Sequence, residues 1–332
     1  MNMKNKPFKA GVIGLGVGMH HLKALEAHTN CKVKKVYDFD KLKCAKLKKK
    51  YPNIEFVKNE KEIFLDDEIN IVSIASYDNF HYQQILDCIK NKKNIIIEKP
   101  ICLNQRQLTN IKKKLKNSNI NITSNLVLRT TSLFKHIKKK VMKKQIISIE
   151  ADYLWGRAHK LYEWRSKIKD YSIIHGCAIH VIDLVVWILN KKPIKVYAMG
   201  NNIGINSKKF TKNSYVIIML KFSNNLIVKV TANASSVYPH FHELKIFSKN
   251  STIIHNLQGS FELKNKKMKV LKFNYPDKMN RFQIIHSFID NLKNRYKKTI
   301  VNKKDIFDTM SICLAAEKSL KLNKEVKIKY EN

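Results

Sequence analysis

The sequence lacks any apolar run long enough to cross a membrane. Nowhere in its 332 residues does an uninterrupted apolar stretch approach the roughly 18 residues that a spanning helix needs. The first residues, Met1–Phe8, are polar and lead directly into a strand-like pattern, without the apolar core and small-residue cleavage site of a secretory signal. These absences predict a cytoplasmic protein that does not act in a membrane.

Cysteine is scarce and unpatterned. The cysteines form no C-x-x-C pair and no zinc-finger spacing, so neither a disulfide framework nor a structural zinc site is indicated. The histidines also show no pair at ligand spacing with a third partner, and we expect no metal. We predict reduced thiols, mostly in the core, at Cys31, Cys44, Cys88, Cys102, Cys177 and Cys313.

Acidic residues and arginine are also few. The 64 basic residues outnumber 26 acidic ones and give a formal net charge of +38, which is typical of nucleic-acid binding when the basic residues cluster. Here 58 of the basic residues are lysines spread along the chain. The lysine runs at 48–50, 112–114 and 138–140 lack the arginine forks and aromatic platforms that read bases. We interpret the charge as solvated surface, with no specific nucleic-acid partner, and keep a nucleic-acid-binding module as a minor alternative.

What the sequence has is periodicity. In the first hundred residues, short β-branched runs alternate with amphipathic, lysine-rich stretches, which is typical of βαβ units around a parallel sheet. From Lys144 onwards, alternating strand-like runs predict an antiparallel sheet, interrupted by helices at 179–189 and 304–322. The other predicted strands and helices are strands 9–14, 32–37, 69–74, 94–97, 120–127, 146–153, 194–200, 215–222, 226–232 and 243–248, and helices 19–28, 41–51, 80–91 and 104–117.

These patterns predict two domains. The first, residues 1–123, is an α/β Rossmann domain with a doubly wound parallel sheet. The second, residues 124–332, is an α+β domain with an open, mostly antiparallel sheet.

A glycine loop follows the first predicted strand. Gly14, Gly16 and Gly18 open a helix, where glycines permit a tight turn and let a pyrophosphate approach the backbone and the helix amino end. The second strand ends at Asp38, near the offset of about 20 residues at which an acid accepts hydrogen bonds from the adenosine ribose. Its carboxylate would repel a 2′-phosphate and so favours NAD over NADP, although nearby Lys41 and Lys43 partly offset that repulsion.

The loop departs from the usual dinucleotide fingerprint. Its spacing is G-x-G-x-G, one residue shorter than G-x-G-x-x-G. A glycine turn without a ligand is the alternative, but the order of strand, glycines, helix and distal acid favours the cofactor loop.

Later segments carry a family resemblance. The residues that carry it are the run 71–75 with His81, the Asn94–Pro100 segment ending in Glu-Lys-Pro, the 125–129 segment, the 176–183 segment, and Ala315, Ala316 and Ser319 in the last helix. Together they resemble the Gfo/Idh/MocA family of glucose-fructose oxidoreductase and inositol dehydrogenase. The short glycine loop with His21 is similar to a variant within that family.

The resemblance implies an NAD(P)-dependent sugar dehydrogenase or reductase that acts on CH–OH groups and assembles as a homodimer or homotetramer. It extends cofactor binding to Ser76, His81, Glu98 and Lys99. Lys99 matches the family's catalytic lysine and His180 its catalytic histidine, so both are expected to face the reacting carbon.

The chemistry of these residue types agrees with that role. Oxidising a secondary alcohol requires a base for the hydroxyl proton, and histidine titrates in a suitable range. Lys99 can polarise the developing oxyanion, and Asp183, three residues after His180 on the same helix face, can orient the imidazole or bind a sugar hydroxyl. A hydrogen-bonded core histidine is the alternative for His180.

One position departs from the family pattern. Many members carry an aspartate four residues before the histidine, and this chain has Gly176 there. The sequence leaves four replacements open, along with proton transfer through His180 alone; these are His175, Tyr171, Asp170 and Tyr153. It also leaves open a catalytically inactive, dinucleotide-binding regulatory or scaffold protein of the same fold.

The substrate class is inferred from residues of the second domain. The segment Tyr153–Lys160 and the stretch Arg165–His175 resemble a subgroup of the family associated with surface polysaccharides and nucleotide sugars. Arg157, Lys160 and Arg165 can clamp a diphosphate, and His240 and His242 can reach sugar hydroxyls; plain surface or sheet roles are the alternative.

Overall fold

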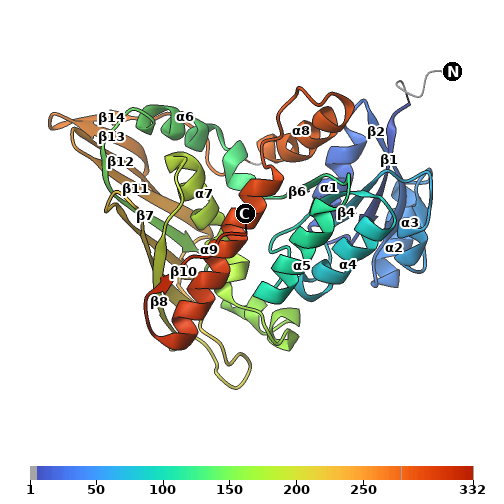
Figure 1. The fold of residues 1–332 in the computed structure, drawn as a ribbon, viewed down its shortest axis with the longest axis horizontal. Coiled ribbons are helices and arrows are strands. Elements are labelled where there is room, and N and C mark those ends of the chain that lie inside the picture. The colour runs from blue at the N-terminus through green and yellow to red at the C-terminus, as the bar shows by residue number, and fades with distance from the viewer. Residues whose placement is uncertain (1–5, 278, 332) are drawn as a thin grey trace. The chain divides into compact units, whose positions relative to one another are not determined.

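The chain divides into two compact units. The computed structural model describes residues 6–277 and 279–331. Of these residues, the first unit comprises 6–102, 106–126 and 281–306, and the second comprises 103–105, 127–277, 279–280 and 307–331 (Figure 1). The sequence predicted a single cut after residue 123, whereas the segment Arg281–Ile306 returns to the first unit. The predicted fold class, a Rossmann domain followed by a mostly antiparallel α+β domain, is confirmed.

The first unit is a doubly wound α/β fold. Its described strands form a six-stranded parallel sheet in the order β3-β2-β1-β4-β5-β6. The strand order, but not the strand direction, reverses between the neighbours β1 and β4. Helices α4 and α5 run side by side (Figure 1), joined by a 2.7 Å bond from Asn110 Nδ2 to the Tyr82 hydroxyl. Its elements are β1 (Phe8–Ile13), α1 (Gly18–Glu26), β2 (Cys31–Tyr37), α2 (Lys41–Lys50), β3 (Glu55–Phe56), α3 (Lys61–Phe64), β4 (Ile71–Ile74), α4 (Asp78–Lys90), β5 (Asn94–Ile97), α5 (Gln105–Lys116), β6 (Ile122–Ser124) and α8 (Phe282–Lys293).

Alternation along β1 sends side chains to both faces of this sheet. Ala10 and Val12 join a core that α1 and α8 complete, with Leu22 and Phe288 in the same cluster. On the other face Gly11 is required, because a Cβ there would collide with Ile63 of α3. Helix α8 therefore belongs to the first unit through its apolar face.

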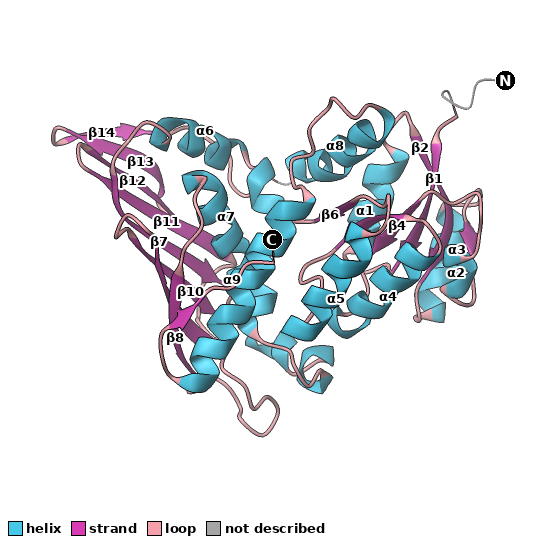
Figure 2. Cartoon of the chain, viewed as in Figure 1, coloured by secondary structure: helices cyan, strands magenta, loops and turns pink. Residues whose placement is uncertain are grey.

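The second unit is built on a mixed sheet. Its described strands form a nine-stranded sheet in the order β14-β13-β12-β11-β7-β10-β9-β8-β15, antiparallel except for the parallel pair β7 and β10 (Figure 2). Its elements are α6 (Ser132–Val141), β7 (Ile146–Leu154), a π-helix (Ile174–Ala178), α7 (Ile179–Leu189), β8 (Lys195–Asn201), β9 (Tyr215–Lys221), β10 (Ile227–Asn233), β11 (Phe241–Ser248), β12 (Ser251–Asn256), β13 (Gly259–Lys264), β14 (Lys267–Val270) and β15 (Val326–Lys327), with short 3₁₀ turns between β7 and the π-helix; α9 (Lys303–Leu322) begins in the first unit and continues here.

Strand β7 of the mixed sheet alternates between buried and more exposed side chains. In β7, Ile149, Ala151 and Tyr153 are buried, whereas Glu150 and Asp152 on the opposite face are half-exposed. Helix α7 packs on β7 and covers the buried face. The almost wholly apolar sequence of α7 agrees with this position, since a helix between a sheet and other helices is buried on most sides.

Within the described residues, no helix combines the length and the apolar character needed to cross a bilayer.

Candidate functional site

The candidate cofactor site lies along the carboxyl edge of the parallel sheet. Gly14, Asp38, Ala75, Glu98 and Asn125 each follow immediately after the end of a strand. The backbone ladder continues past the strand ends, because Gly14 N donates to Tyr37 O at 2.8 Å and Glu98 N to Ile74 O at 2.9 Å. Open parallel sheets bind ligands at this edge, where the strand order reverses.

The glycine loop has the tight geometry that the sequence predicted. Gly14 has φ +85°, and a Cβ there would collide with the Ala75 carbonyl oxygen. A Cβ on Gly18 would lie 3.1 Å from Ala75 Cβ, so this glycine lets α1 approach β4. A Cβ on Gly16 would meet nothing within 4 Å. The loop thus leaves open space beside the amino end of α1, which fits a pyrophosphate group.

Asp38 is bound to the same loop. Its Oδ2 accepts from Leu15 N at 2.6 Å and its Oδ1 from Asp40 N at 2.8 Å. Lys43 Nζ lies 3.4 Å from Oδ2, and Asp38 is 6% exposed. The carboxylate therefore fixes the glycine loop against the end of β2 and retains lone pairs for a further donor.

A buried network links α1 to the segment after β5. His21 Nδ1 lies 2.7 Å from Ser73 Oγ, and its Nε2 lies 3.0 Å from Glu98 Oε1, which also accepts from Asn125 Nδ2 at 2.6 Å. Burial by itself would raise the pKa of Glu98, but the hydrogen bond and charge of His21, the charge of Lys99 and the Asn125 bond outweigh it and lower the pKa to about 2. Glu98 is therefore a carboxylate at neutral pH.

The sequence did not connect these four residues. His21 was noticed only as part of a loop variant, and Ser73 and Asn125 only as letters in longer runs. The signal that could have connected them is their place in the fold. Ser73, Glu98 and Asn125 lie in or directly after strands of the parallel sheet, and His21 lies on α1.

The remaining predicted cofactor residues line the same edge. The Ser76 hydroxyl donates to Gln84 Oε1 at 2.6 Å. The His81 ring is fully buried, with Nδ1 2.6 Å from Pro100 O and Nε2 3.2 Å from Ser76 O, so it joins the segments that follow β4 and β5. Lys99 is half-buried and stands between Glu98 and Pro100.

In the second unit, His180 occupies the first turn of α7, directly after the π-helix that contains Gly176. A Cβ at Gly176 would collide with the Tyr171 hydroxyl oxygen. Tyr171 is 2% exposed and packs edge-on against Trp164 and Phe210. The space beside position 176 is therefore filled by the Tyr171 phenol, which explains locally why glycine stands there.

His180 belongs to a cluster of imidazole and phenol rings. Its ring stacks on Tyr153 with centroids 5.6 Å apart and an angle of 11° between the planes, and it lies 6.3 Å from His242. The Tyr153 hydroxyl lies 3.0 Å from His240 Nε2, and His242 Nδ1 bonds the Tyr275 hydroxyl. The predicted residues His180 and His242 thus lie in one group, to which the fold adds Tyr275.

Asp183 lies in a buried ion pair. Arg129 Nε donates to Asp183 Oδ2 at 2.9 Å and Arg129 Nη2 to Oδ1 at 2.7 Å, with Thr309 Oγ1 3.1 Å from Oδ1. Arg129 and Asp183 are 2% and 1% exposed. Both carboxylate oxygens therefore accept bonds from the protein's own residues.

The predicted phosphate-binding arginines are half-buried. The Arg165 guanidinium lies over the ring of Trp164 at 4.3 Å and over that of Trp155 at 5.2 Å, and its Nη1 donates to Lys160 O at 3.3 Å. Arg157 directly follows Gly156, a glycine with φ +56°.

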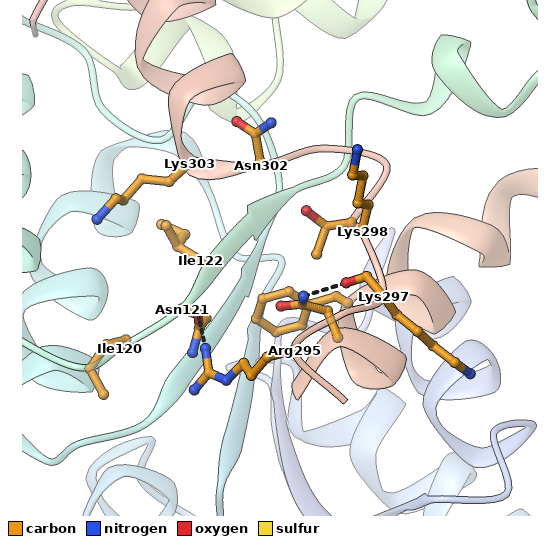
Figure 3. A pocket seen from close by; sticks show the side chains of 11 residues that line it. Ile120, Asn121, Ile122, Arg295, Lys297, Lys298, Asn302 and Lys303 are labelled. Carbon is orange, nitrogen blue, oxygen red and sulfur yellow. Dashed lines mark hydrogen bonds between the residues drawn. The ribbon is translucent and has the colours of Figure 1, made fainter. Parts of the chain in front are cut away.

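A separate pocket opens on the first unit. It has a volume of about 390 Å³ and lies at the amino end of β6, whereas the glycine loop lies at the carboxyl edge of the same sheet. Arg295 Nη1 donates across it to Asn121 Oδ1 at 2.9 Å (Figure 3). Its lining residues are Ile120, Asn121, Ile122, Phe288, Asn291, Arg295, Lys297, Lys298, Thr299, Asn302 and Lys303. In the described part of the chain, no group of three or more histidine, cysteine or acidic side chains is arranged to hold a metal ion.

Known proteins share both units. Residues 8–125 match an oxidoreductase family with an NAD-binding Rossmann fold, and residues 145–261 match the Gfo/Idh/MocA C-terminal domain. The myo-inositol 2-dehydrogenase of Thermotoga maritima is 22% identical over 256 residues, which cover 74% of each chain.

Two solved structures show the same fold. The myo-inositol 2-dehydrogenase of Lactobacillus plantarum superposes with a TM-score of 0.84 at 19% identity, covering 98% of this chain and 100% of the other. The scyllo-inositol dehydrogenase of Lactobacillus casei, solved with NAD(H) and scyllo-inositol, superposes with a TM-score of 0.80 at 17% identity, covering 97% and 99%. With matches to both of its domains, the chain belongs to the Gfo/Idh/MocA family of NAD-binding oxidoreductases.

Proposed function

We propose that the protein transfers a hydride between a nicotinamide dinucleotide and a secondary alcohol or ketone of a sugar or nucleotide sugar. The observation that carries the proposal is the carboxyl edge of the parallel sheet, where the glycine loop, Asp38 and Glu98-Lys99-Pro100 follow three of its strands. The inositol dehydrogenases among the similar proteins support a polyhydroxylated ring as substrate.

We propose NAD as the preferred cofactor over NADP. Asp38 is positioned to accept hydrogen bonds from a ribose diol and would repel a 2′-phosphate. Lys43, 3.4 Å away, weakens that repulsion without removing it, because the lysine side chain is itself 37% exposed.

In the proposed reaction His180 and Lys99 act on the substrate oxygen. When bound, the nicotinamide accepts the hydride from the alcohol carbon, or returns it in the reverse direction. His180 takes the hydroxyl proton as the carbonyl forms, and the Lys99 ammonium donates a hydrogen bond to the oxygen that carries the developing charge.

We revise the role proposed for Asp183. Because its oxygens accept from Arg129 and Thr309 inside the unit, we assign it to holding α7, and with it His180, instead of contacting a sugar. Arg157, Arg165 and His242 remain the proposed substrate contacts. The two tryptophan rings hold the Arg165 guanidinium in place, which suits recognition of a phosphate group.

We also propose a homo-oligomer that pairs through the outer face of the mixed sheet. Met199 and Ile217 are register partners on that face, and Met199 and Ile227 are 49% and 48% exposed. Multi-angle light scattering tests this: Met199→Lys is expected to shift a dimer or tetramer towards monomer, whereas an unchanged mass would reject this face.

The first experiment is calorimetric titration of NADH and NADPH into the wild type, Asp38→Ala, and the exposed control Asp67→Ala. Loss of a charge-assisted hydrogen bond is expected to weaken NADH binding by roughly 10- to 100-fold and to erode the preference over NADPH. The control is expected to match the wild type. If neither NADH nor NADPH binds, the proposal is rejected.

The chemical step needs its own test. A screen of sugars and nucleotide sugars, followed at 340 nm, is expected to find a substrate whose turnover falls in Lys99→Ala and His180→Gln. If NADH binds but no compound in a broad screen changes the redox state of the cofactor, the catalytically inactive scaffold becomes the better interpretation.

A further inference from the structure

The mixed sheet places one tyrosine directly beneath His180. Tyr153 on β7 and His242 on β11 are register partners, so both side chains leave the sheet on the same face. This is the buried face that α7 covers, and Tyr153 is 5% exposed. Strand register and helix packing together bring the Tyr153 ring against the first turn of α7.

The contact between the two rings is parallel. The Tyr153 and His180 rings are stacked at 11°, whereas the Tyr153 and His242 rings meet edge to face at 80° with centroids 4.6 Å apart. A stacked phenol restricts rotation of the imidazole about its last side-chain torsion, which is otherwise a broad and soft one. His180 is thus supported on one ring face by a side chain that is itself fixed by the sheet.

The Tyr153 hydroxyl has a partner of its own. It lies 3.0 Å from His240 Nε2, and burial raises the pKa of this phenol well above its usual value, so the group stays neutral and forms a hydrogen bond with the imidazole. The hydroxyl therefore anchors the ring at its far end while the ring face contacts His180.

We propose that Tyr153 is a positioning residue that fixes the plane of the His180 imidazole and stabilises its protonated form through the face of the phenol ring. A cation over an aromatic face is attracted by the quadrupole of the ring, so the stack strengthens at the moment when His180 takes the substrate proton. This inference rests on the proposed function for its catalytic consequence, but the stacking effect on His180 does not depend on it.

Other titratable groups surround Tyr153. The rings of His240 and His242 contact its ring, and His242 also lies beside His180. Four further groups act electrostatically on its phenol: Cys177, Tyr171, Tyr275 and Arg157. The comparison must therefore change Tyr153 and leave all of these in place.

The test is nuclear magnetic resonance of the His180 ring protons, assigned by their loss in His180→Gln. In the wild type, ring current from Tyr153 is expected to shift one of these protons upfield of the free-histidine position. In Tyr153→Leu the upfield shift is expected to disappear and the titration midpoint of His180 to fall, because the protonated form loses its aromatic partner. Tyr153→Phe, which keeps the ring and loses the bond to His240, is expected to retain both.

Tyr197→Leu is the matched control, because Tyr197 lies on β8, three strands from β7 in the same sheet. A His180 proton that is not shifted upfield in the wild type would overturn the proposal even if Tyr153→Leu fails to fold. An unchanged midpoint in a folded Tyr153→Leu would overturn it as well.

Turnover separates this proposal from the proposed function. With a substrate from the screen, Tyr153→Leu is expected to lower kcat about 2- to 12-fold with KM for NADH unchanged, the range that corresponds to one aromatic stack. If His180→Gln leaves turnover intact while Tyr153→Leu still moves the His180 resonances, His180 is not the base and the positioning role stands. If His180→Gln abolishes turnover and Tyr153→Leu changes neither the His180 resonances nor kcat, His180 remains the proposed base and the positioning role of Tyr153 is rejected.

Discussion

The two units build their candidate sites in different ways. In the first unit, the residues stand at the ends of parallel strands, so Gly14, Asp38 and Glu98 meet because each strand stops at the same edge. In the second unit, the cluster around His180 stands on the face of a mixed sheet, where Tyr153 and His242 meet only through the register of two strands. An edge site follows from strand order, whereas a face site follows from register and from the helix packed on it.

The two sites also use charge differently. At the edge, Asp38 and Glu98 are carboxylates bound by backbone N–H groups or by a neighbouring imidazole. On the face, the rings around His180 are phenols and imidazoles, and the nearest carboxylate in that helix, Asp183, is buried against Arg129. We therefore expect that substitutions which disrupt the ring cluster on the face of the mixed sheet leave the cofactor site at the edge of the parallel sheet unchanged.

The largest expected effect is from Asp183→Asn, which leaves the buried Arg129 guanidinium without its counter-charge. Breaking one side of a buried ion pair costs about 3–5 kcal/mol, so urea unfolding of the variant is expected to show a loss of this size in the free energy of unfolding. Asp152→Asn, at a half-exposed position on the outer face of the same sheet, is expected to cost about 1 kcal/mol or less. If the folded Asp183→Asn protein also loses NADH affinity, the two sites are not independent and the comparison fails.

A second effect is expected from His255, which is 2% exposed and lies beside Phe134 and Tyr275. Burial lowers its pKa to about 4 from the ordinary 6.5, so between these values the unfolded chain binds a proton that the folded chain does not. Stability is therefore retained above pH 6.5 and falls as the pH drops from 6.5 to 4, by up to about 3 kcal/mol.

This dependence is measured by urea unfolding at a series of pH values in the wild type and in His255→Phe. The variant is expected to show a shallower slope of unfolding free energy between pH 6.5 and 4, whatever its stability at pH 7. His159→Gln, at an exposed position, serves as the control and is expected to keep the wild-type slope. Parallel slopes for wild type and His255→Phe would exclude His255 as the source.

The smallest effect is expected from the basic pocket at the opposite end of the parallel sheet. Arg295→Gln and Lys298→Gln change charge at the amino end of β6, whereas the cofactor edge is the carboxyl end. Both side chains are exposed, so salt screens their effect over such distances. NADH affinity by calorimetry is expected to stay within about twofold at 0.15 M salt. A tenfold loss would mean that binding does not depend on the strand-end groups alone.

Much of the fold was predictable because its signals are local. Short apolar, β-branched runs and a glycine-rich turn placed β1, β2, β4, β5 and the loop at Gly14–Gly18 close to where they are. Helices α6 and α8 and the strands β12–β14 were not predicted. The return of α8 to the first unit could not be inferred either, because one apolar helix face does not specify which core it covers.

The candidate site divides along the same line. Gly14, Gly16, Gly18 and Asp38 were predicted from their spacing along one chain segment, and Lys99 and His180 from the family resemblance. The pairing of Asp183 with Arg129, and of His21 with Ser73 and Glu98, joins residues 52 to 77 positions apart. No local pattern encodes such a pair, since both partners are chosen by the packing that buries them.

The sequence by itself determined the alternation of strands and helices in the first unit, the glycine loop with its distal acid, and the resemblance to the family to which the chain belongs, because each depends on residues near one another along the chain. Tertiary structure alone decided that the phenol of Tyr171 fills the space at Gly176 and that Tyr153 lies beneath His180. These contacts depend on strand register and on which sheet face a helix covers, and both are settled only when the apolar faces pack together.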